Sequence, residues 1–261
     1  MRKSIFAFLL TCVSAPAFAT DNDTELATEI SNPIASLVSV PFQFNYNCCL
    51  GPEKAGQMLL NVQPVIPFQL NDTWTLITRT IVPVIDQGET IQGVGNRFGL
   101  GDTLQSFFFA PKPAPGSIMW GAGPAILWPT GTDAQFSGRK WGAGPTVVAL
   151  KQEAGWTYGV LTNHIWSFAG DGNFPRVSTT SVQPFLAYQW PDTTTLTFTS
   201  ESQYDWVAAQ WTVPLDLVIS HIYKLGSQPL SFQLGPRYFP VTPSQGAHWG
   251  FRVNLSFLFP Q

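Results

Sequence analysis

Five charged residues fall in segments that are otherwise apolar, and their positions give the first indication of chemistry. They are Arg79, Glu201, Asp216, Arg237 and Arg252. In a β-strand, side chains two residues apart point to the same face, and this parity places all five charges on the face opposite the apolar one. Opposed charges on an enclosed face can set a field across a narrow pore and orient a solute. They can equally pair with each other and fill a lumen too tight for any solute.

The order of these charges along the chain predicts which of them are neighbours. Arg237 and Arg252 fall on consecutive predicted strands and would form a basic patch, while Glu201 and Asp216 would form an acidic patch in the same way. Small barrels of about eight strands are filled by side chains, whereas barrels of about 16–18 strands leave a channel. A barrel of intermediate size therefore leaves both the open and the filled lumen as interpretations.

A catalytic role would require a nucleophile within hydrogen-bond reach of a base, and His164 is the candidate base. Ser167 follows three residues later, so the two side chains would point to opposite faces of a strand. The residue that shares the face of His164 is Trp166. We therefore expect no enzyme activity, no catalytic residues and no cofactor. An outer-membrane lipid hydrolase is kept as an alternative.

Cys48 and Cys49 are adjacent in the sequence and cannot join distant segments. In an oxidising compartment they could form a vicinal disulfide, stay as thiols or bind a metal. Two cysteines without a nearby His or third Cys make a weak metal site. We expect two thiols or a local disulfide in a loop, and no metal.

The first residues have the order of a secretory signal peptide. Arg2 and Lys3 precede an apolar run at 5–13, and Ala17-Phe18-Ala19 provides small residues for cleavage after Ala19. We expect a signal peptide at 1–19, a periplasmic arm or short helix at 20–33 and one barrel domain at 34–261. A lipoprotein signal ending at Cys12 is the less favoured alternative.

The composition restricts the class of protein further. Charged residues make up only 11% of the chain, and aromatic residues make up 14%, including 10 Trp and 20 Phe. A soluble domain with so few charges would have a poorly soluble surface. After the signal, however, no run supplies the roughly 18 apolar residues of a membrane-spanning helix. The net charge of -3 gives no reason to expect a nucleic-acid partner.

From residue 34 onwards, segments rich in Val, Thr, Phe and Trp alternate with turn residues. About twelve such segments predict an antiparallel transmembrane β-barrel with an even number of strands, an all-β fold. The connections alternate between short and long, with 207–209 as the exception, and place both chain ends on the periplasmic side. The segments are 35–46, 57–68, 74–85, 98–110, 117–128, 141–151, 156–168, 177–190, 194–206, 210–224, 229–239 and 248–259.

Alternation within the segments predicts which side chains face lipid. In the last segment the outward set is Phe251, Val253, Leu255, Phe257 and Phe259, and Arg252, Asn254 and Ser256 face the lumen. Tryptophans near the segment ends predict two aromatic girdles at the membrane surfaces. The segment 98–110 is less regular, because uninterrupted parity would place Gly99, Gly101 and Gln105 on the lipid face.

Several long blocks resemble a known bacterial family, among them "SNPIASLVSVPFQFNYNCC", "NVQPVIPFQLNDTWTLITRTIVPVI", "WGAGPAILWPTGTD" and "QWTVPLDLVIS". The family comprises outer-membrane transporters whose members often carry the mistaken name "neuromedin U". It is similar to the barrel proteins of the meta-pathway of phenol degradation. The resemblance covers nearly all of the chain after the signal.

The resemblance implies a barrel in the outer membrane of a Gram-negative bacterium that passes small hydrophobic or aromatic solutes. Its expected partners are membrane lipid, these solutes and, during biogenesis, the barrel-assembly machinery. A structural barrel with a plugged lumen is the main alternative. A soluble periplasmic all-β protein is disfavoured, because exposed aromatic faces of this extent would aggregate.

Overall fold

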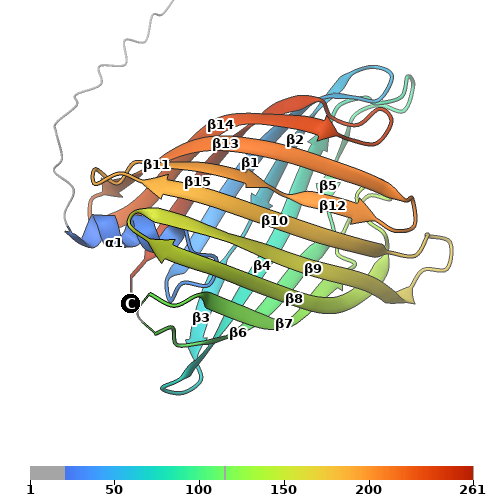
Figure 1. Ribbon diagram of the computed structural model, residues 1–261. Helices are drawn as coiled ribbons and strands as arrows, with labels where there is room; N and C mark the ends of the chain where they lie inside the picture. The colour runs from blue at the N-terminus through green and yellow to red at the C-terminus, as the bar shows by residue number, and fades with distance from the viewer. Residues whose placement is uncertain (1–20, 115, 261) are drawn as a thin grey trace, which may run out of the picture.

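The protein is described by a computed structural model at residues 21–114 and 116–260. The predicted signal peptide at 1–19 lies outside the described residues. Helix α1 (Asp21–Ile30) comes first, and the described elements after it are β-strands. The sheet closes on itself because the first strand pairs antiparallel with the last, from Val38 opposite Phe259 to Cys48 opposite Trp249 (Figure 1). The predicted all-β barrel is confirmed.

The strand segments form one antiparallel sheet of twelve barrel strands, because three strands are interrupted. The interrupted strands are β2 with β3, β5 with β6, and β11 with β12. The bounds are β1 (Val38–Leu50), β2 (Ala55–Val62), β3 (Val65–Gln69), β4 (Trp74–Gln87), β5 (Arg97–Leu100), β6 (Thr103–Pro111), β7 (Met119–Trp128), β8 (Lys140–Glu153), β9 (Trp156–Gly170), β10 (Ser178–Gln189), β11 (Thr195–Ser200), β12 (Ser202–Asp205), β13 (Gln210–Leu225), β14 (Gln228–Val241) and β15 (Trp249–Phe259).

Two interruptions coincide with prolines, which cannot donate a ladder hydrogen bond. Pro64 separates β2 from β3, and its carbonyl still accepts from Thr80 N. Glu201 separates β11 from β12, and the register on either side places it opposite Pro214, where the pairing of β13 with β14 also shifts. These local breaks leave the order of the barrel strands intact.

The third interruption, between β5 and β6, is a bulge that changes the facing of the strand. Gly101 and Asp102 are consecutive, yet both line the barrel interior, and Leu104 follows on the same face. Gly101 therefore does not face lipid, as uninterrupted parity would have required, because one additional inward residue resets the alternation. Gln105 does lie on the outer face, where it donates to Thr80 Oγ1.

The connections distinguish the two ends of the barrel. We call the end that contains α1 and the end of β15 the proximal end, and the opposite end the distal end (Figure 1). Proximal turns include the two-residue turn Ala154-Gly155, in which both residues have positive φ, as a tight hairpin requires. The distal connections include the longer loops 88–96, 129–139 and 242–248.

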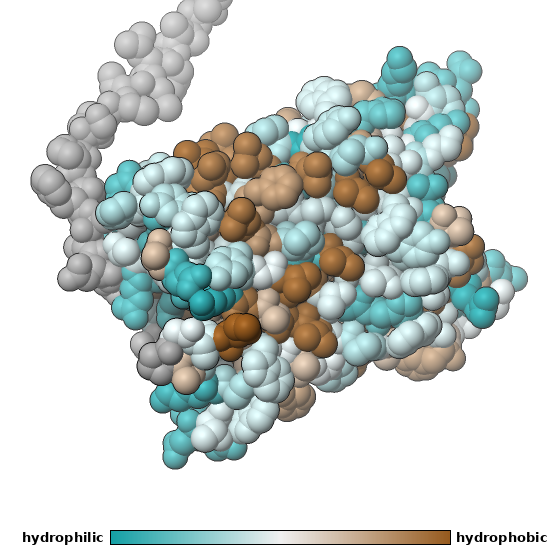
Figure 2. Space-filling view, viewed as in Figure 1, coloured by the Kyte–Doolittle hydropathy of each residue, from teal (hydrophilic) through white to brown (hydrophobic). Residues whose placement is uncertain are grey.

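The outer wall is apolar in the middle and aromatic at both ends. Brown, hydrophobic residues gather at mid-height in Figure 2, and teal residues lie towards the two ends. Aromatic contacts form clusters near each end, as predicted for interfacial girdles. The proximal contacts are Trp74–Trp120 and Trp156–Tyr188, and the distal contacts are Trp128–Trp141 and Tyr204–Trp211.

Helix α1 occupies the proximal mouth of the barrel. Leu26 and Ala27 are buried against Ile222 of β13 and Leu258 of β15, both of which point inward. Polar contacts fix the helix further, because Gln189 Nε2 donates to Thr24 O and Gln152 Nε2 to Thr28 O. Among the described residues, no helix has the length and apolar character needed to cross a membrane.

Candidate functional site

A cluster of charged side chains lies on one side of the lumen, on the neighbouring strands β13, β14 and β15 and at the interruption between β11 and β12. We call Glu201, Asp216, Arg237 and Arg252 the lumenal ion cluster. Arg252 Nη2 lies 2.7 Å from Glu201 Oε2 and 3.6 Å from Asp216 Oδ2. Arg237 lies 3.6 Å from Glu201 Oε2 and 3.7 Å from Asp216 Oδ1. Each guanidinium therefore lies between both carboxylates.

An amide from β1 completes the lumenal ion cluster. Asn45 Oδ1 accepts from Arg237 Nη1 at 2.7 Å and from Arg252 Nε at 2.8 Å. Asp216 is fully buried, and its neighbours Arg237 and Arg252 are almost so. Charges taken out of water are stable only when paired, so this network holds strands β13, β14, β15 and β1 to the β11–β12 interruption.

The predicted arrangement of separate basic and acidic patches is wrong in its geometry. Arg237 and Arg252 are on adjacent strands as expected. Side chains of both signs interleave, however, because Asp216 is the direct register partner of Arg237 and each guanidinium lies between 2.7 and 3.7 Å from both carboxylates. Sequence reasoning did not single out Asn45. The alternation of Gln43, Asn45 and Asn47 with apolar residues was an available signal for an inward polar row.

Arg79 lies apart from the lumenal ion cluster. Its Nη2 donates to Gln63 Oε1 at 2.7 Å, and among the described residues it forms no ion pair. Glu201 attracts the Arg79 guanidinium across the lumen, and Arg252 repels it. Gln63 lies with Pro64 in the break between β2 and β3, so the interruption of the strand positions the amide beside Arg79.

The lumen contains two cavities, one on each side of these charges. The distal cavity has a volume of about 690 Å³ and the proximal cavity about 210 Å³. The proximal cavity is bounded by the end of α1 and the segment that follows it, and the distal cavity reaches the loops 129–139 and 242–248. The side chains that line both are Gln63, Arg79, Gln183 and Glu201. These four residues form the partition of the lumen.

Asp102 anchors a distal loop over the larger cavity. Its carboxylate accepts from Gly131 N at 3.0 Å, Ser137 Oγ at 2.7 Å and Gly138 N at 2.8 Å. The bulge before β6 turns Asp102 inward, where these donors surround it. Phe136 of the same loop lines the distal cavity. The loop is therefore fixed against the barrel wall and shapes the distal opening.

The proximal mouth carries charged contacts of its own. Lys224 Nζ lies 2.7 Å from Asp23 Oδ1, which ties the start of α1 to β13. Glu29, near the end of α1, faces the proximal cavity. Burial raises the pKa of the Glu29 carboxyl, and the Glu25 carboxylate raises it further. The helix is thus held by an ion pair at one end and carries an unfavourable charge at the other.

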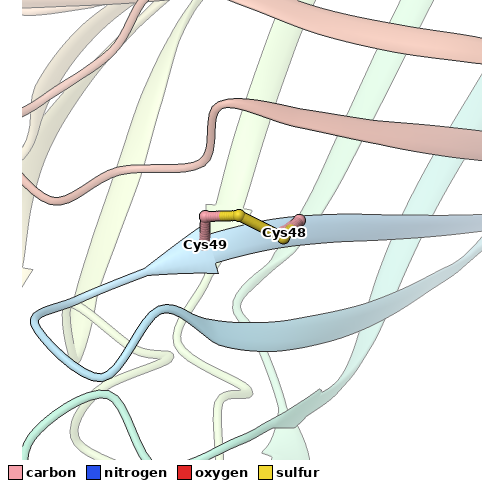
Figure 3. The surroundings of a disulfide bond; sticks show 2 residues. All are labelled: Cys48 and Cys49. Carbon is pink, nitrogen blue, oxygen red and sulfur yellow. A yellow bond between two sulfur atoms is a disulfide. The ribbon is translucent and has the colours of Figure 1, made fainter.

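Cys48 and Cys49 are joined as a vicinal disulfide at the distal end of β1 (Figure 3). Cys49 has a φ of +76°, and the register between β1 and β2 shifts between Asn47 and Leu50. His248 N donates to Cys48 O, so the bulge also contacts the connection before β15. The pair lies at the rim, away from the residues that partition the lumen.

His164 lies on the outer face of β9. Its Nδ1 is 2.7 Å from Thr180 Oγ1 and its Nε2 is 3.4 Å from Ser178 Oγ on β10. The ring packs beside Trp166, with 4.0 Å between centroids. Ser167 Oγ instead accepts from Val177 N, so it does not serve His164 as a nucleophile. The contacts place His164 within the distal aromatic girdle.

Comparison with known proteins supports the fold. No family model and no curated protein matches the sequence. A crystal structure of an outer membrane channel from Pseudomonas putida F1 is similar with a TM-score of 0.64 at 16% identity, over 85% of this chain and 93% of that one. The outer membrane phospholipase dimer of Salmonella typhi with bound calcium reaches 0.49 at 11% identity, over 93% and 99%. That value is too low to support an inference about activity.

Proposed function

We propose that this protein is an outer-membrane channel of a Gram-negative bacterium that passes small hydrophobic or aromatic solutes by diffusion. The observation that carries the proposal is a closed barrel whose lumen holds two cavities separated only by side chains. Its outer wall, apolar between two aromatic girdles, matches the band that a bilayer requires. The P. putida channel supports the same architecture for this fold.

In this proposal the structure represents a closed state, and α1 is the gate. The helix fills the proximal mouth, and the segment after it lines the proximal cavity. The helix holds its place through apolar contacts, two glutamine side chains and one ion pair. These contacts leave it separable from the barrel, whose own strands are joined by continuous ladders.

Liposome swelling tests the proposal with a solute that crosses lipid slowly by itself, such as a phenyl glucoside. Leu26→Asp places a charge in the apolar contact of α1, and we expect faster swelling than with the wild type. Leu70→Asp is the matched control, because Leu70 is 51% exposed in a turn at the same end. A change in gel mobility on boiling would report that each variant is folded.

The second candidate is a structural barrel, favoured by the lumenal ion cluster and by α1, which together interrupt the lumen. It predicts folded protein that gives no swelling, whether or not Leu26 is replaced. That result would remove the channel function and leave the fold unchanged. Swelling with Leu26→Asp alone would instead identify a channel that α1 closes.

A further inference from the structure

We propose that the distal cavity binds an organic anion with an apolar body, and that Arg79 and Gln63 hold its carboxylate. The inference rests on the proposed function, since it names the class of solute that would occupy this lumen. Binding itself needs no passage through the barrel, and the two can be tested separately. The volume of about 690 Å³ lies within the range of about 300–1,000 Å³ that ligand sites occupy.

Among the five charged residues around the partition, one positive charge has no ion-pair partner. Three guanidinium groups, Arg79, Arg237 and Arg252, face two carboxylates, Glu201 and Asp216, which gives an excess of +1. Among the described residues, Arg79 is the member of this set that forms no ion pair. A monoanion is therefore the ligand charge that would pair with Arg79.

Two further acidic groups line the cavity walls, but neither pairs with Arg79. Asp102 lines the distal cavity, but its carboxylate already accepts three hydrogen bonds from the loop 129–139. Glu29 lies on the α1 side of the proximal cavity, beyond the partition. Neither forms a hydrogen bond or ion pair with Arg79 among the contacts of the described residues.

Arg79 has donors to spare for a carboxylate. A guanidinium carries five N–H donors in a planar fork that fits a carboxylate with two parallel hydrogen bonds. One of them is used by Gln63 Oε1, at 2.7 Å from Nη2. Its Nε and Nη1 have no hydrogen-bond partner among the described residues, and Arg79 lines both cavities. Gln63, which lines them too, brings an amide N–H₂ group to the same place.

An apolar row begins directly beside Arg79 on the distal side. Ile81 is two residues along the same face of β4, and it pairs with Leu104, which in turn pairs with Leu127. All three line the distal cavity. A molecule with its carboxylate at Arg79 would lay its apolar body along this row. A neutral apolar molecule could use the row but would leave the guanidinium without a partner.

Calorimetric titration of the folded, detergent-solubilised full-length mature protein tests the site with hexanoate and 1-hexanol, which share a chain length and differ in charge. We expect hexanoate to bind the wild type, and Arg79→Gln to weaken its binding by about tenfold or more, because a charge-assisted contact is lost. Arg97→Gln is the matched control, since Arg97 pairs with Asp133 outside both cavities. Arg79→Lys keeps the charge and should retain part of the affinity.

Three results would overturn the site. They are absence of hexanoate binding to the wild type, hexanoate binding that Arg79→Gln leaves unchanged, and an equal loss with Arg97→Gln. If Arg79→Gln fails to fold, the titration of Arg79→Lys tests the site instead. Loss of the planar guanidinium fork should weaken the binding of hexanoate and leave the binding of 1-hexanol unchanged. Hexanoate binding without swelling would reject the channel and keep the site. Swelling without hexanoate binding would reject the site and keep the channel.

Discussion

Arg252 Nη2 and Glu201 Oε2 lie 2.7 Å apart inside the barrel, although the two residues are 51 positions apart in the sequence. Arg252 comes from the last strand and Glu201 from the break between β11 and β12. The same carboxylate lies 3.6 Å from Arg237 Nη2, so one acidic side chain bridges two guanidinium groups. Glu201 therefore lines both cavities and pairs with two guanidinium groups at the same time.

Replacing Glu201 with Gln should lower the free energy of unfolding by about 3 kcal/mol, because two enclosed guanidinium groups lose their shared carboxylate. Denaturant unfolding followed by tryptophan fluorescence in detergent would measure the change. Glu53→Gln is the control, since Glu53 is exposed in the turn between β1 and β2. Equal stability of the two variants would mean that the ion cluster contributes nothing net.

Ion selectivity should follow the charge of the partition. Relative to the wild type, Glu201→Gln makes the lumen more positive by one charge and should shift the selectivity towards anions, whereas Arg79→Gln makes it more negative by one charge and should shift the selectivity towards cations. Reversal potentials across planar bilayers in a gradient of dilute KCl would measure this, because salt screens fixed charges. Leu26→Asp can be combined with each variant if α1 closes the pore. Equal reversal potentials in all three proteins would contradict the prediction.

Replacing Asp102 with Ala should free the loop 129–139, because three hydrogen bonds to one charged acceptor are lost. Hydrogen bonds to charged groups are worth about 1.5–3 kcal/mol each, so local opening should become far more frequent. Limited trypsin digestion would detect it as cleavage after Arg139. The control variant is Asp72→Ala, in an exposed proximal turn, and trypsin should cleave its loop 129–139 at the wild-type rate. An unchanged rate for Asp102→Ala would show that other contacts hold the loop.

The stability with which α1 packs in the proximal mouth should depend on pH through the ionisation of Glu29. Burial raises the pKa of the Glu29 carboxyl in the folded protein. The ionised carboxylate therefore weakens the packing of α1 in the proximal mouth at pH values above that raised pKa. This loss of stability disappears as the pH falls towards 4.5, the usual pKa of a glutamate carboxyl. Glu29→Gln should therefore raise the thermal midpoint slightly at pH 7 and leave it unchanged at pH 4. A shift of the same size at both pH values would contradict the assignment.

The strands, their approximate limits and the facing of most residues can be predicted from the amino-acid pattern alone. Lipid covers one face of each strand and the lumen the other, so the two-residue alternation of Phe251 to Phe259 with Arg252 to Ser256 is a local signal. Turn residues between the segments predict the number of strands. The alternation of loop lengths predicts that both chain ends lie at the same end of the barrel.

The way in which the interior is filled depends on the closed barrel. Closure of the barrel brings Arg252 to Glu201 and leaves Arg79 beside Gln63, because contacts inside a barrel depend on strand register and tilt rather than on sequence order. The bulge at Gly101-Asp102 resets the facing of one strand, and the sequence marks the irregularity of that segment but not the position of the bulge. Helix α1 reaches its place in the mouth through contacts with Ile222 and Leu258, which lie near the opposite end of the chain.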